Sequence, residues 1–146
     1  MTSELENLND SELMLEDPHL DIRRRKVVDK HGLEIGHVSD LFIDVADRKV
    51  RMIEVRAGGF IGIGDRHVLL PVDAIVGITK DEVHVDATRE RVIASPAYDP
   101  ALLEDPTPKF WEPYYGYYGL LPYWGNGYIY PSFPSEERPV PPLNAR

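Results

Sequence analysis

Histidine, serine and carboxylate side chains are the groups of this chain that could take part in catalysis or bind a metal ion. The five histidines lack the i, i+3 or i, i+4 spacing with which a helix holds a metal ion. They are His19, His31, His37, His67 and His84. Ser39 is followed by Asp40 inside a predicted strand, whereas a hydrolase nucleophile needs a sharp strand-to-helix turn. The chain has no cysteine, which excludes disulfides, thiolate metal sites and cysteine nucleophiles. We therefore expect no enzymatic activity, no catalytic residue, no metal ion and no cofactor.

A glycine cluster between Gly58 and Gly64 is a further candidate, because glycine lets backbone amides approach a phosphate group. Its Gly-Gly-x-x-Gly-x-Gly spacing matches neither the dinucleotide-binding fingerprint nor the P-loop, and a strand is predicted where those motifs need a helix. We predict a flexible hairpin connector. Its apolar side chains Phe60, Ile61 and Ile63 would either cover a barrel end or contact a partner.

Aromatic residues are concentrated between Phe110 and Phe133. Large rings bury much apolar surface at low entropic cost, and they are enriched at protein interfaces. We expect this segment to bind another protein or a membrane interface. Two alternatives are a disordered segment and a segment that wraps its own barrel. The candidate partner-binding residues are Phe110, Trp111, Tyr114, Tyr115, Tyr117, Tyr118, Tyr123, Trp124, Tyr128 and Tyr130.

Between Asp21 and Tyr98 the sequence contains six β-rich runs, which turn residues separate at intervals of about ten residues. This pattern is typical of a small all-β sandwich or barrel, which would position the candidate residues. We predict an all-β fold, a small six-stranded barrel. In the last run, Val83 and Val85 would face the core and His84 would face outward. The predicted strands are Lys26–Asp29, Glu34–Asp44, Val50–Ala57, His67–Leu70, Ala74–Ile78 and Glu82–Val85.

Two extensions flank the predicted barrel, which covers residues 23–98. Residues 1–22 form an acidic N-terminal arm with a weak helical signal, because its asparagine and aspartate residues favour turns. Residues 99–146 form a tail rich in proline and tyrosine. Proline fixes φ and lacks a donor N–H, so we predict an irregular, extended tail with one short helical turn over residues 100–105.

Charge and hydropathy limit the partners. The chain has 25 acidic and 16 basic residues, a net charge of −9 that argues against nucleic-acid binding. No run reaches the roughly 18 to 20 apolar residues of a membrane span, and the N-terminus does not match a signal peptide. We therefore expect a soluble, cytoplasmic chain without a transmembrane segment of its own. The basic run Arg23–Lys26 would contact phosphate, an anionic lipid surface or an acidic partner, or else pair with the chain's own acids.

Six motifs follow one another in the predicted barrel: Val27–Asp29, Gly32 with Ile35–Gly36, Val38–Asp44, Arg51–Val55, Leu69–Ile75 and Val83–Val85. In these motifs the chain resembles the PRC-barrel family. That family includes the cytoplasmic domain of the photosynthetic reaction-centre H subunit and the C-terminal domain of a ribosome maturation factor. The resembling region, residues 26–98, is half of the chain, and its motifs are more specific for the fold than for a function.

The resemblance implies a non-enzymatic, H-subunit-like accessory protein that docks on the cytoplasmic face of a photosynthetic reaction centre and stabilises it. Such a protein would be attached peripherally to the inner membrane through protein subunits of that complex. H subunits have an N-terminal transmembrane helix, which this sequence lacks, so the resemblance is to a soluble H-like subunit.

One residue role also follows only from the resemblance. In H subunits an acidic residue before the Arg-x-x-Glu-Val strand contributes to proton delivery, and the matching position is Asp47; an ordinary acidic turn is the alternative. Two other functions stay open: a stand-alone stress-related adaptor or ligand-binding module, and a ribosome-associated RNA-binding protein.

Overall fold

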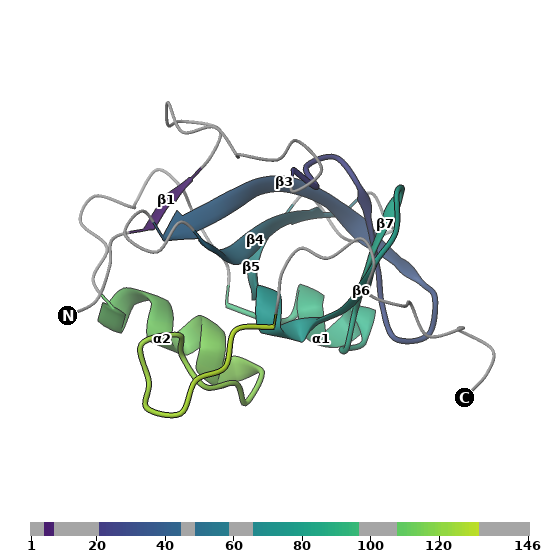
Figure 1. The fold of residues 1–146 in the computed structure, drawn as a ribbon. Coiled ribbons are helices and arrows are strands. Elements are labelled where there is room, and N and C mark those ends of the chain that lie inside the picture. Colours follow the sequence, from purple (N-terminus) through teal and green to yellow (C-terminus); the bar gives the residue numbers. More distant parts are fainter. Residues whose placement is uncertain (1–4, 8–20, 45–48, 59–65, 97–107, 132–146) are drawn as a thin grey trace.

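A computed structural model of the chain describes residues 5–7, 21–44, 49–58, 66–96 and 108–131 (Figure 1). These residues form a curled β-sheet with short helices beside it (Figure 1). The strands are β1 (Leu5–Asn7), β2 (Lys26–Val28), β3 (Glu34–Asp44), β4 (Lys49–Ala57), β5 (Arg66–Pro71), β6 (Ile75–Ile78) and β7 (Glu82–Val85). The helices are the 3₁₀ helix η2 (Val72–Ala74) and the α-helices α1 (Arg89–Ile93) and α2 (Pro108–Tyr117).

The six strands from β2 to β7 form one continuous sheet in the order β5-β4-β3-β2-β7-β6. Neighbouring strands are antiparallel, except that β2 and β7 are parallel. Register shifts interrupt the β2–β3, β3–β4 and β6–β7 pairs, and such bulges help a sheet to bend. The sheet curls into a half-barrel (Figure 1), which confirms the prediction of a small six-stranded all-β barrel.

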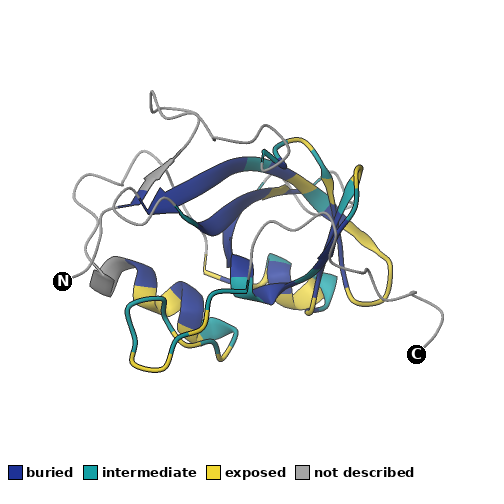
Figure 2. Cartoon of the chain, viewed as in Figure 1, coloured by how far each residue is buried: buried dark blue, intermediate teal, exposed yellow. Residues whose placement is uncertain are grey.

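One face of this sheet encloses the main hydrophobic core. Figure 2 shows that most of the residues in the sheet are buried. The members of the main core alternate along the strands, as Ile53, Val55 and Ala57 do in β4, because successive side chains of a strand point to opposite faces. Val83 and Val85 lie in this core as predicted. His84 does not face solvent as expected: it is 6% exposed, because β7 has a neighbouring strand on both sides.

The opposite face of the sheet is also apolar at one place. Phe42, Met52 and Leu69 come from β3, β4 and β5. Phe42 and Leu69 each lie between two members of the main core in sequence, and Met52 directly precedes one. Phe42 is directly opposite Met52 in the register. All three are buried, at 0 to 1% exposure, because α2 and β1 cover them. We call this second cluster the outer core.

The helix α2 corrects the prediction of an irregular tail. Proline at position 113 removes one helical hydrogen bond, yet the helix continues through it to Tyr117. Trp111, Tyr114 and Tyr115 are spaced i, i+3, i+4, so they share one face of the helix, and all three are buried in the outer core. The burial of three large rings on the sheet offsets the lost hydrogen bond, which proline content alone does not reveal.

The N-terminal arm contains a strand that the sequence did not indicate. β1 pairs antiparallel with the end of β3, with Leu5 opposite Asp44 and Asn7 opposite Phe42. Leu5 is 4% exposed and belongs to the outer core. The pairing supplies backbone partners to this short segment, so tertiary contact decides its conformation rather than local propensity.

The helix α1 follows β7 and is also absent from the predicted elements. Thr88 caps it, since its Oγ1 accepts a hydrogen bond of 3.2 Å from the Arg91 amide. Asp29 fixes its start, because one carboxylate oxygen accepts from the Arg89 amide at 2.8 Å and the other accepts from two amides of the β2–β3 turn. Burial alone would raise the pKa of Asp29, but these three backbone hydrogen bonds hold it below its usual value.

Candidate functional site

The C-terminal segment, residues 108–131, is held on the barrel at several places, and the first is a β-bulge at Arg51. Residue pairing between β3 and β4 passes from Phe42–Met52 to Ile43–Val50, so Arg51 is the extra residue of the bulge. A bulge turns the extra side chain away from the regular alternation of the strand. Arg51 is nevertheless only 4% exposed, because the C-terminal segment covers it.

One carboxylate and three tyrosine rings surround the guanidinium group of Arg51. Asp44 Oδ2 accepts hydrogen bonds from Arg51 Nε at 3.2 Å and from Nη2 at 3.0 Å. The guanidinium carbon lies 4.4 Å from the ring centroid of Tyr123, 5.4 Å from that of Tyr130 and 5.8 Å from that of Tyr128. These distances are those of cation–π contacts. We call these five residues the Arg51 cage.

The guanidinium group of Arg51 keeps its positive charge although it is buried. Burial lowers the pKa of Arg51, but the hydrogen bonds and negative charge of Asp44 outweigh that effect and raise it. Tyr130 also donates a hydrogen bond from its hydroxyl to the Val50 carbonyl at 3.0 Å. The loop after α2 is therefore tied to β4 by cation–π contacts and a hydrogen bond, while the ion pair of Arg51 with Asp44 holds the guanidinium group in place.

Asp73 of η2 lies beside the cage. Its Oδ1 atom and the hydroxyl oxygens of Tyr115 and Tyr128 are buried. Burial raises the pKa of Asp73, although the nearby Tyr128 hydroxyl and Arg51 act in the opposite direction. Burial also raises the pKa of Tyr115 and of Tyr128. Burial therefore disfavours the charged form of each of these three groups.

The second place where the segment is held is the outer core. The rings of Phe42 and Trp111 meet edge to face, with centroids 5.4 Å apart and an interplanar angle of 62°. Tyr115 and Trp124 meet in the same way at 5.7 Å and 79°. Aromatic pairs of this geometry contribute about 0.5 to 1.5 kcal/mol beyond the buried area. The outer core therefore fixes α2 and the loop after it as one unit.

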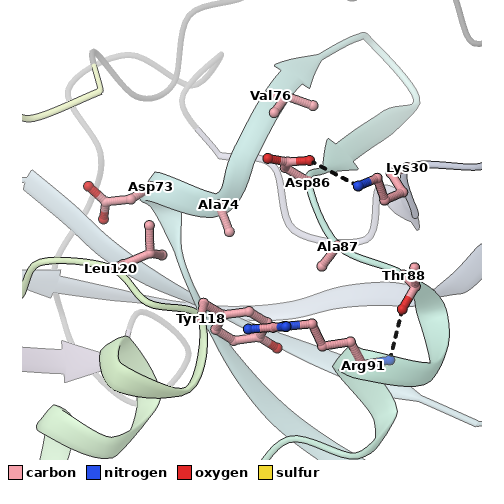
Figure 3. Close-up of a pocket in the computed structure, with 10 residues that line it drawn as sticks. All are labelled: Lys30, Asp73, Ala74, Val76, Asp86, Ala87, Thr88, Arg91, Tyr118 and Leu120. Carbon is pink, nitrogen blue, oxygen red and sulfur yellow. Dashed lines mark hydrogen bonds and ion pairs between the residues drawn. The ribbon is translucent and has the colours of Figure 1, made fainter. Parts of the chain in front are cut away.

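A pocket of about 590 Å³ opens where η2, α1 and the C-terminal segment meet (Figure 3). Lys30, Asp86, Thr88 and Arg91 line it from the barrel side, and Tyr118 and Leu120 line it from the segment. We call it the α1 pocket.

Most of the aromatic residues predicted to bind a partner contact the barrel of their own chain. Trp111, Tyr114 and Tyr115 are buried, and the partly exposed members are Tyr117, Tyr118, Tyr123, Trp124, Tyr128 and Tyr130. This is the alternative in which the segment wraps its own barrel. Partner binding through the surface that the segment leaves exposed stays a prediction.

Other predicted site residues lie outside the described part of the chain. They are the loop residues Phe60, Ile61 and Ile63, the acid Asp47 and the side chain of Phe110. The predicted helical turn over residues 100–105 lies outside it as well.

The basic run makes contacts within the chain. Arg23 pairs with Asp21 at 2.6 Å, and Arg25 donates a hydrogen bond to the Thr79 carbonyl at 2.8 Å. These contacts favour the interpretation that the run pairs with groups of its own chain.

Sequence reasoning missed Asp44, Arg51, Asp73 and Arg91 as members of the site. A signal existed for Arg51, because it is a charged residue between the apolar residues Val50 and Met52. The bulge that redirects it depends on the pairing with β3, which the sequence of β4 alone does not encode.

Comparisons with known proteins agree with the fold. Within the described ranges, no helix is long and apolar enough to cross a membrane. A search among curated proteins finds no significant match. A comparison with protein families matches residues 19–92, half of the chain, to the PRC-barrel domain. The chain therefore belongs to the PRC-barrel family.

Proposed function

We propose that this PRC-barrel protein is a non-enzymatic accessory subunit that docks on a larger protein assembly and stabilises it. The observation that carries the proposal is the exposed apolar surface on the loop after α2. Leu121 is 46% exposed and Ile129 is 82% exposed. Among the described residues, one other large apolar side chain is exposed to a similar extent: Leu33 in the β2–β3 turn, at 43%.

The loop is fixed before it meets a partner. The Arg51 cage holds it on one side, and the Gly125 amide donates to the Pro122 carbonyl at 2.9 Å within it. A surface that is already ordered loses less conformational entropy on binding than a disordered tail does. Leu121 and Ile129 are thus presented to a partner on a rigid support, while the buried rings serve to build that support.

The finer proposal names the partner as the cytoplasmic face of a photosynthetic reaction centre. Its support is the resemblance to H subunits in the Asp40–Val55 block and the presence of a C-terminal extension after the barrel. In that setting the protein is attached peripherally to the inner membrane through protein subunits, without nucleic acid. A part for Asp47 in proton delivery belongs to the same proposal.

The experiment compares three tagged, full-length forms in gentle purifications from native membranes: the unmodified chain, the double variant L121S/I129S and the control variant L33S. Burial of a large aliphatic side chain contributes about 1.5 kcal/mol or more, so loss of two should weaken docking about a hundredfold. We expect the unmodified chain and L33S to travel with pigment-bearing complexes, and the double variant to be lost from them. Equal co-purification of L121S/I129S and L33S would overturn the assignment of the docking surface.

A further inference from the structure

The α1 pocket is not used by the proposed docking surface, and it has the features of a ligand site. Figure 3 shows Arg91 lying along the ring of Tyr118 at one side of the pocket, with Lys30 and Asp86 at another. Its volume of about 590 Å³ falls within the range of roughly 300 to 1,000 Å³ that is typical of small-molecule sites.

Arg91 is held in a fixed position beside this pocket. Its guanidinium carbon lies 5.3 Å from the ring centroid of Tyr117 and 5.8 Å from that of Tyr118. Arg91 Nη2 donates to the Tyr117 carbonyl at 2.7 Å, and the Tyr117 hydroxyl donates to the Arg91 carbonyl at 2.6 Å. A guanidinium fixed by stacking is prepared to bind a carboxylate or phosphate in a bidentate manner.

The second cation of the pocket, Lys30, already has a carboxylate beside it. Lys30 Nζ lies 3.9 Å from Asp86 Oδ1. Arg91, in contrast, has no carboxylate partner among the described residues, and only Nη2 makes a hydrogen bond with them. The guanidinium group carries five N–H donors, so most remain available to a ligand.

The remaining walls of the pocket are partly apolar. Ala74, Ala87 and Leu120 line it between the charged groups. The Tyr118 hydroxyl oxygen is buried, and it is a further polar group at the pocket. Asp73 and Asp86 also line the pocket, so the anionic group of a ligand would be held at Arg91 and its apolar body would lie against the apolar residues.

We propose that the α1 pocket binds a small organic carboxylate, with the carboxylate on Arg91 and the apolar body against Ala74, Ala87 and Leu120. The pocket is completed by Tyr118 and Leu120, so such a ligand would contact both the barrel and the C-terminal segment. This binding activity goes beyond the docking role and does not depend on it.

Calorimetric titrations of the full-length protein with benzoate test the proposal. Benzamide has the same ring without the charge, acetate has the charge without the ring, and inorganic phosphate is a second anion without an apolar body. We expect benzoate to bind about tenfold more tightly than each of these three. R91Q should weaken benzoate binding about tenfold, whereas K80Q, which removes an exposed cation in the β6–β7 turn, should leave it unchanged.

Four results would overturn the proposal: absence of benzoate binding, equal binding of benzoate by R91Q and K80Q, binding of acetate or phosphate as tight as that of benzoate, and binding of benzamide as tight as that of benzoate. Because R91Q also removes the contact with Tyr117, a second measurement uses the unmodified chain. In nuclear magnetic resonance spectra, benzoate should shift the amide signals of Thr88 and Arg91. Shifts confined to residues distant from the pocket would equally refute the site.

Discussion

Replacement of Arg51 by methionine should release the C-terminal segment from the barrel. The side chains of Arg51 and Asp44 are 5% and 0% exposed, and their charged atoms are 3.0 Å apart. Removal of one member of a buried ion pair costs about 3 to 5 kcal/mol, because the other charge loses its counter-charge in a poorly hydrated place. The three cation–π contacts are lost at the same time. We expect R51M to destabilise the docked segment by about 3 kcal/mol or more.

The two tryptophans make this change observable. Trp111 and Trp124 are the only tryptophans of the chain and both lie in the C-terminal segment, so tryptophan emission reports on its docking. Urea titrations of R51M should show a red shift at lower denaturant concentration than in the unmodified protein. The double variant D44N/R51M should recover part of the loss, because it also removes the buried carboxylate charge. A change of less than about 1 kcal/mol in R51M would refute the reasoning that the cage holds the segment.

Two further predictions concern the same segment. W111A removes a ring that is 2% exposed, so it should lower the stability of the docked segment by about 3 to 5 kcal/mol and shift the emission of Trp124 to the red. The variant E112A changes the exposed neighbouring residue and should have little effect. Equal behaviour of the two variants would contradict the packing of α2 on the outer core. Burial raises the pKa of Tyr118 from its usual 10.0 to about 12, so the folded protein holds this proton more tightly than the unfolded chain. Its contribution to stability is complete below about pH 10 and is lost as the pH rises to about 12. Tyr115 and Tyr128 also titrate late, so Y118F should lose one of several late-titrating tyrosines in a titration of tyrosinate absorbance, and an unchanged titration in Y118F would refute the prediction.

Much of the barrel follows from local sequence pattern. The six strands of the sheet were predicted to within one residue at each end, because alternation and turn residues are both strong between Asp21 and Val85. The pattern of β4 also predicted its core face correctly. The covered position of His84 was missed, because exposure of an outward side chain depends on which strands lie beside it.

The candidate site could be predicted only in part. The aromatic segment stands out by composition, but its proline content hides the helix α2, whose i, i+3, i+4 rings need the apolar patch of Phe42, Met52 and Leu69 to be stable. That patch is visible in the sequence only once the register of three strands is known. The Arg51 cage likewise joins residues of β3, β4 and the C-terminal loop through a bulge, a feature of strand pairing rather than of any one segment.

The central claim, that the protein is an accessory subunit of a membrane assembly, is tested most directly by its distribution in native cells. Membranes would be isolated and solubilised gently, and the unmodified chain would be followed through separation of the pigment-bearing complexes. The proposal predicts that the chain travels with a pigment-bearing complex at a constant ratio to its other subunits. Recovery of the chain in the soluble fraction alone, with none on the pigment-bearing complexes, would contradict it.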